Sequence, residues 1–247
     1  MKLLGELEIV RYPSRQDERC DLGVIRVKFD IRYKPAFATI FITLEPGEKM
    51  TAEAGSMVSM DADLSVKTTF SGGFFSAFLK KWFGGESLFV NTFINTTQFP
   101  RQLVLSQSTP GDIVAVELSG KQPLCFQPGA YIASTPNVKL GIGWAGLSSW
   151  FAGEGLFKLK VKGKGTVFFG AYGGISQQYM TQDLIVDNGH LVAYENGIKM
   201  GIGLAGGLLG SMTSGEGFIN KLQGKGVIYL QSRSLDGLIK FLSPKCR

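Results

Sequence analysis

Two glycine strings are the parts of this sequence that most resemble a cofactor site. Gly141, Gly143 and Gly146 form one GxGxxG string, and a second is formed by Gly201, Gly203 and Gly206. A dinucleotide site needs a strand before the string, a helix after it, and an acidic residue about 20 positions further on to bind the ribose. Neither string clearly has this context, so we predict no cofactor-binding loop and no cofactor.

Two GKG sequences are the next candidates, because glycine and lysine can bind phosphate. They occur in GKGTVFF at 163–169 and in GKGVIYL at 224–230. A Walker loop needs G-x-x-x-x-G-K followed by Ser or Thr, and Gly163-Lys164-Gly165 lacks that order. We therefore predict that both sequences form the tight turns of β-hairpins.

Histidine and cysteine are too few for metal or nucleophilic chemistry. His190 is the only histidine, whereas a metal site of the cupin kind needs several histidines and a carboxylate. It lies beside a predicted turn, where an exposed polar residue is expected. Cys20, Cys125 and Cys246 are odd in number and widely spaced, which excludes a CxxC metal site and indicates a reducing compartment. We predict no catalytic and no metal-binding residue, and hence no enzyme.

Three glutamates occupy matching places in a repeated pattern. Glu86, Glu154 and Glu216 each follow a glycine and precede an apolar run, in GGESLFV, GEGLFKL and GEGFIN. Ahead of each pattern stands a turn dipeptide: Pro46-Gly47, Pro128-Gly129 or Asn188-Gly189. We interpret the glutamates as structural groups that accept backbone hydrogen bonds or pair with lysine, and not as three converging catalytic carboxylates.

Lysines alternate with apolar residues from 157 to 164, which is typical of a half-buried strand. Phe157, Leu159 and Val161 are expected on the buried face. The other face carries Lys158, Lys160, Lys162 and Lys164. These lysines either stay solvated and protect a sheet edge or form a patch that contacts an anionic surface.

The segment before each glutamate is rich in glycine and apolar residues. These segments, called tips below, read FSGGFFSAFLKKWF at 70–83, LGIGWAGLSSWF at 140–151 and GIGLAGGLLGSM at 201–212. They are too short to cross a bilayer as helices, but their side chains must be covered by their own module, by other subunits or by lipid. Lys80 and Lys81 would suit an anionic headgroup layer. The candidate interface residues are Phe74, Phe75, Phe78, Trp82, Phe83, Trp144, Trp150, Phe151, Leu208 and Leu209.

A framework of strands must position these residues. Short apolar or β-branched runs at 36–44, 56–60 and 112–118 are bounded by turn residues, and the best helix candidates, 74–83 and 235–242, are short. The repeated pattern predicts an all-β protein made of three β-sandwich modules packed side by side. We place a lead segment at 1–33 and the modules at 34–110, 111–178 and 179–247.

The ordered motifs resemble those of the altered-inheritance-of-mitochondria family and its bacterial relatives. The resemblance rests on PGEKMTAEAGSMVSMDADL at 46–64, GGESLFVNTFIN at 84–95, GEGLF at 153–157, GKGTVFFGAYG at 163–173, GEGFI at 215–219 and GKGVIYLQS at 224–232. It implies three repeated domains similar to the tryptophan RNA-binding attenuation protein, a short double-stranded β-helix variant, assembled into a ring-like trimer. It implies no established enzyme activity, and it links the eukaryotic relatives to organisation of the mitochondrial inner membrane.

Composition and charge are those of a folded protein. Hydrophobic residues make up 44% and charged residues 19% of the 247 residues, and glycine, with 33 residues, is about twice as common as usual. The net charge of +6 permits an anionic partner but is weak for a dedicated nucleic-acid binder. The start, MKLLGELEIVRY, lacks the features of a signal peptide, so we expect a cytoplasmic protein with peripheral membrane attachment as a second location.

These observations predict a non-enzymatic scaffold that assembles with itself as a homotrimer. Its tips are expected to meet other subunits or a membrane surface. Two alternatives remain. One is a nucleic-acid-binding protein that uses the lysine face, suggested by the lysine stripe and by the resemblance to an RNA-binding fold. The other is a small-ligand-binding protein with a pocket inside one module.

Overall fold

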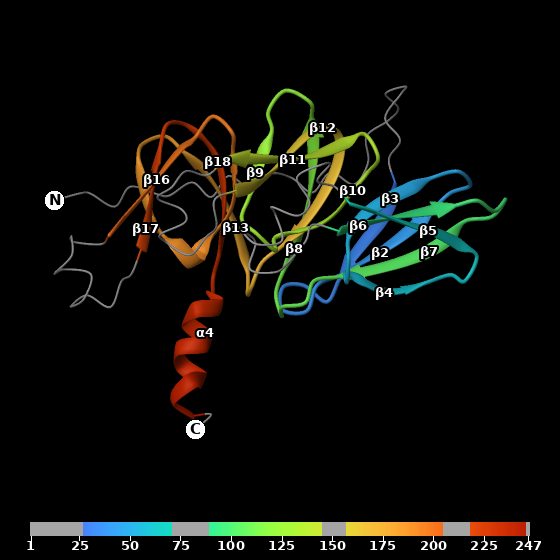
Figure 1. Cartoon of the computed structure of the whole chain (residues 1–247), viewed down its shortest axis with the longest axis horizontal. Helices are drawn as coiled ribbons and strands as arrows, with labels where there is room; N and C mark the ends of the chain where they lie inside the picture. The colour runs from blue at the N-terminus through green and yellow to red at the C-terminus, as the bar shows by residue number, and fades with distance from the viewer. Residues whose placement is uncertain (1–26, 71–88, 145–156, 205–217, 246–247) are drawn as a thin grey trace, which may run out of the picture.

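The computed structural model describes residues 27–70, 89–144, 157–204 and 218–245, which form antiparallel strands and one α-helix within these ranges. Figure 1 shows the strands distributed along the long axis of the molecule, from β4 (Met57–Met60) at one end to β16 (Lys199–Leu204) at the other. The predicted all-β class is confirmed.

A four-stranded sheet lies at one end of the molecule. Its order is β1 (Lys28–Arg32), β2 (Thr39–Leu44), β7 (Arg101–Ser106) and β4. In β2, Ile40, Ile42 and Leu44 are buried while the residues between them are partly exposed, as the two-residue repeat of a strand requires. The strands predicted at 36–44 and 56–60 are therefore confirmed.

An eleven-stranded sheet runs through all three predicted modules. Its path is β13 (Ile175–Met180), β18 (Gly226–Gln231), β15 (Leu191–Glu195), β9 (Leu124–Phe126), β12 (Phe157–Gly170), β10 (Tyr131–Ser134), β3 (Lys49–Glu53), β6 (Phe89–Asn95) and β5 (Leu64–Phe70). Beside this path, β8 (Ile113–Ser119) and β11 (Val138–Trp144) also pair with β12. The strand predicted at 112–118 is β8.

A three-stranded sheet completes the β structure, in the order β14 (Leu184–Asp187), β17 (Phe218–Gln223) and β16. A single-turn 3-10 helix, η2 (Asn188–His190), joins β14 to β15. The last two described elements are the helix α4 (Leu235–Leu242) and a second 3-10 helix, η3 (Ser243–Lys245). The helix predicted at 235–242 is confirmed, and the candidate at 74–83 lies outside the described residues.

The GKG sequences are not hairpin tips, so that prediction was wrong. Gly163 and Gly165 lie inside the single long strand β12, which pairs with β11 and β9 before them and with β8 and β10 after them. Their φ angles of 126° and 146° fall in the region that favours glycine, and a Cβ at Gly163 would overlap the carbonyl oxygen of Asn137. The glycines therefore let one strand bend between two sets of partners. The second GKG, at 224–226, separates β17 from β18, which likewise pair with different strands.

Two of the three predicted turn dipeptides have the expected glycine conformation. Gly47 and Gly129 follow proline in tight turns and have φ angles of 82° and 77°. The third turn is η2, capped by the Asp187 carboxylate, which accepts a hydrogen bond from the Gly189 N–H at 3.0 Å. At this turn a side chain larger than that of glycine would not fit, because a Cβ on Gly189 would come within 2.6 Å of Ser234 Cβ.

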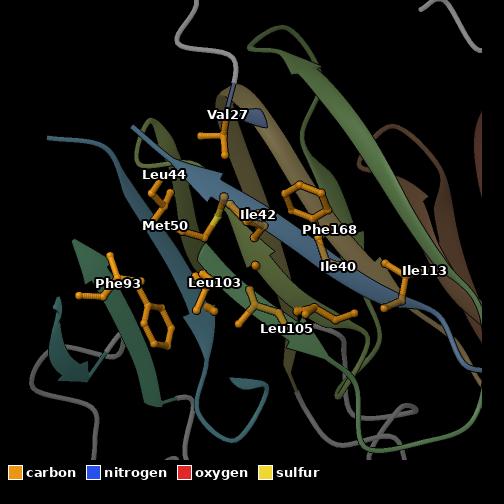
Figure 2. Packing of buried hydrophobic residues seen from close by; sticks show 14 of the residues in the cluster. Val27, Ile40, Ile42, Leu44, Met50, Phe93, Leu103, Leu105, Ile113 and Phe168 are labelled. Atoms are coloured by element: carbon orange, nitrogen blue, oxygen red, sulfur yellow. The ribbon is translucent and has the colours of Figure 1, made fainter. Parts of the chain in front are cut away.

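Buried apolar residues form three clusters that join neighbouring parts of the chain. Figure 2 shows the first, in which Phe168 of β12 packs with residues from β2, β3, β6 and β7. The second contains Phe126, Phe169 and Tyr229, whose rings meet edge to face with centroids about 5 Å apart. The third contains Cys125 and Tyr194. Since strands from different predicted modules supply each cluster, the modules share their cores.

Candidate functional site

Each tip connects two antiparallel strands that remain paired up to the last described residue. The terminal pairs are Phe70 with Phe89 in β5/β6, Trp144 with Phe157 in β11/β12, and Leu204 with Phe218 in β16/β17. Three segments that are apolar in sequence therefore occupy the same position, at the end of a hairpin.

Most of the predicted interface residues lie outside the described residues. These are Phe74, Phe75, Phe78, Lys80, Lys81, Trp82, Phe83, Trp150, Phe151, Leu208 and Leu209, and the same holds for Glu86, Glu154 and Glu216. Trp144 is described for its backbone alone, as the last residue of β11.

The glycine strings begin within strands. Gly141 and Gly143 belong to β11, where they pair with Lys160 and Lys158, and Gly201 and Gly203 belong to β16. Gly146 and Gly206 lie outside the described residues. A dinucleotide loop instead follows the end of its strand and opens a helix, so the first two glycines of each string have a different structural context.

The predicted lysine face divides into two environments. The alternation is confirmed, since Leu159 and Val161 are buried while Lys162 and Lys164 are exposed. Lys158 and Lys160 are half-buried. The Nζ atom of Lys158 donates a hydrogen bond to the buried Tyr194 hydroxyl at 2.7 Å and lies 4.9 Å from the centre of its ring. One end of the stripe therefore fastens β12 to β15 and does not form part of a continuous cationic surface.

Cys125 lies beside this lysine pair, an arrangement that the cysteine spacing did not predict. Its side chain is fully buried, and its Sγ atom is 3.6 Å from Asn196 Oδ1. Burial raises the pKa of the Cys125 thiol, while the positive charges of Lys158 and Lys160 partly oppose that rise. A thiol that stays protonated and inaccessible is a poor nucleophile, which points to a packing role.

His190 connects η2 to the end of β18. Its Nδ1 atom forms a hydrogen bond with the Gln231 carbonyl oxygen at 2.8 Å, and Gln231 Nε2 donates to the Gly189 carbonyl at 2.7 Å. The residue is half-buried, whereas the sequence predicted an exposed loop residue. Within the described ranges, no group of three His, Cys, Asp or Glu residues could hold a metal ion.

A cavity of about 620 Å³ lies where residues of all three predicted modules meet, and no sequence motif indicated it. Among the described residues, Glu53 is its one charged lining residue. Three glutamines also line it, Gln107, Gln127 and Gln231. Gln107 Nε2 donates to the Ala171 carbonyl at 2.8 Å, and Gln231 Oε1 accepts from the Tyr172 N–H at 2.9 Å. These side chains hold the modules together.

The helix α4 presents apolar side chains that no other element of the described residues covers. Ser234 caps its first turn by accepting a hydrogen bond from the Gly237 N–H at 3.1 Å, but none of the eight helical residues is buried. Leu235, Ile239, Phe241 and Leu242 are all exposed, and Figure 1 shows the helix extending away from the strands. The spacing of Leu235, Ile239 and Leu242 places them on one side of the helix, and Phe241 lies on its flank, about 100° from Leu242. Of the helices that the structure describes, none has the length and apolar character needed to cross a membrane.

Comparisons with known proteins agree with this architecture. A family model described as mitochondrial biogenesis AIM24 matches residues 29–233. An uncharacterized protein of Streptococcus pyogenes serotype M6 is 31% identical over 222 residues, which cover 85% of this chain and 88% of that protein. The crystal structure of a Streptococcus pyogenes protein superposes with a TM-score of 0.72 at 28% identity, covering 89% of this chain and all of that one. The chain belongs to the mitochondrial biogenesis AIM24 family.

Proposed function

We propose that the protein is a non-enzymatic scaffold that assembles as a homotrimer and attaches to a membrane surface through its three tips. In this proposal the three hairpins belong to three equivalent β-sandwich modules, at 34–110, 111–178 and 179–247. Each module would resemble the tryptophan RNA-binding attenuation protein in fold.

The observation that carries the proposal is the shared placement of the tips. In sequence, all three lead from one strand to the antiparallel strand that pairs with it up to the last described residue, and the sequence is uncharged from Leu140 to Gly153 and from Met200 to Gly215. A monomer rarely leaves several such apolar segments uncovered. Three matching contacts also suit attachment to a surface, because linked weak contacts reinforce one another.

The lysine environments count against nucleic-acid binding. Backbone recognition needs accessible cations that follow the phosphates, and Lys158 instead donates to a buried tyrosine. The remaining exposed pair, Lys162 and Lys164, is too small for a dedicated binding surface. The cavity likewise favours no ligand, since two of the three glutamines that line it, Gln107 and Gln231, are engaged with the backbone.

Vesicle flotation tests the attachment. The full-length chain should float with vesicles of phosphatidylcholine, and Trp150→Glu should reduce the floating fraction because a charge in a tip opposes insertion into the interface. Phe99→Glu is the control, since Phe99 is exposed and lies in the turn between β6 and β7. Wild-type protein that stays with the unbound fraction, or equal loss in both variants, would refute attachment through the tips.

A further inference from the structure

The exposed face of α4 is a second candidate contact surface, separate from the tips. The exposed fractions are 45% for Leu235, 55% for Ile239, 61% for Phe241 and 42% for Leu242. Within the described ranges, no other element buries these four large apolar side chains. A surface of this kind is typical of a site that meets another molecule.

The charged residues near this face indicate the chemistry of the partner that it binds. Arg233 precedes the helix in sequence, Lys240 lies within it and Lys245 follows it, and Asp236 is the one acidic residue between 233 and 245. The Nζ atom of Lys245 lies 3.4 Å from the centre of the Phe241 ring, so a cation and an aromatic side chain stand together at the exposed end of the helix. Aromatic and basic residues gather in this way at the boundary between lipid tails and headgroups.

We propose that α4 and η3 bind the headgroup layer of membranes that contain anionic lipid. The apolar side of α4 would lie along the acyl boundary, while Lys240 and Lys245 would contact anionic headgroups. Each such lysine contributes about fivefold to binding of an anionic surface at moderate salt. The inference rests on the proposed attachment to membranes, but it uses residues that the tips do not supply.

The two contacts differ in a way that can be measured. The second and third tips are uncharged and gain little from anionic lipid, whereas Lys80 and Lys81 give the first tip a charge of its own. The gain from anionic lipid that is lost when Lys240 and Lys245 are replaced therefore reports on α4, because that replacement leaves the tips unchanged.

The test measures flotation of the full-length chain with phosphatidylcholine vesicles and with equal mixtures of phosphatidylcholine and phosphatidylserine, at low and high salt. Phosphatidylserine should increase binding of the wild-type chain about 25-fold at low salt, about fivefold for each of the two lysines. Replacing both Lys240 and Lys245 by Gln should lower that gain roughly 25-fold, and Phe241→Glu should abolish it. Phe99→Glu is the matched control, because both phenylalanines are similarly exposed, at 66% and 61%.

The same experiment separates the two proposals. If the α4 variants bind mixed vesicles as wild type does, or lose no more than Phe99→Glu, the α4 inference is overturned while Trp150→Glu still decides the role of the tips. If Phe241→Glu instead changes the molar mass in solution and leaves vesicle binding unchanged, α4 contacts a second copy and the inference is also overturned. Loss confined to mixed vesicles at low salt supports it.

Discussion

The Lys158 ammonium holds a position between strands that its neighbours on β12 do not share. It donates to the Tyr194 hydroxyl at 2.7 Å, while Lys162, four residues further along, is exposed. A hydrogen bond from a charged donor to a buried partner contributes more to stability than an exposed charge does. Within one alternating stripe, therefore, a single lysine links β12 to β15.

Lys158→Met should lower the free energy of unfolding by about 1–2 kcal/mol, because the charge-assisted hydrogen bond to Tyr194 is lost. The control, Lys162→Met, should change it by less than about 0.5 kcal/mol, as is usual for an exposed position. Urea unfolding of the two variants measures the difference. Equal effects would show that the hydrogen bond contributes nothing to stability.

The buried Cys125 thiol should make the protein less stable at alkaline pH. Burial raises the pKa of Cys125 in the folded state, so above the ordinary thiol pKa the unfolded chain loses a proton that the folded chain retains. The folded state then binds more protons, and the free energy of unfolding falls as pH rises, by at most about 1.4 kcal/mol per pH unit for one thiol.

Unfolding measured from pH 7 to pH 10 checks this, with Cys125→Ala as the comparison. The variant should be less stable at pH 7, because it leaves space in the third core cluster, and its stability should decline less steeply above pH 8.5. Parallel curves for the two proteins would exclude Cys125 as the source of the pH dependence.

Among the elements, β12 shows most clearly what sequence patterns could and could not predict. Its alternation correctly predicted a half-buried strand, because that pattern depends on one residue and its immediate neighbours. The bend at Gly163 and Gly165 was mistaken for a hairpin, because glycine indicates an unusual backbone angle without indicating which strands pair on either side. The helix α4 was predicted, but its uncovered face was not, since covering depends on distant segments.

Gly163→Ala should destabilise the fold by more than about 2 kcal/mol. The new Cβ would overlap the Asn137 carbonyl oxygen, and the residue would have to keep a φ of 126°, which alanine rarely adopts. Gly201→Ala is the control, because nothing lies within 4 Å of a Cβ there and Gly201 is also a strand residue. Thermal unfolding of both variants should give a melting temperature for Gly163→Ala that is well below that of Gly201→Ala. Similar melting temperatures would mean that β12 does not need a left-handed residue at its bend.

For the whole molecule, the continuous eleven-stranded sheet and the shared cores make one body of the segments predicted as modules. The family, the all-β class and several strands could be predicted from motifs and periodicity. The cavity could not be predicted, because its lining residues come from seven short stretches of sequence between Glu53 and Leu235. No rule of sequence spacing connects these stretches.

The central claim, that this chain is a self-assembling scaffold, is tested most directly by its molar mass in solution. Light scattering after size-exclusion chromatography of the full-length protein, over a wide range of concentrations, provides that mass. We expect three times the chain mass of 26.8 kDa, unchanged on dilution through the micromolar range. A protein that keeps the mass of one chain at the highest concentration would contradict it.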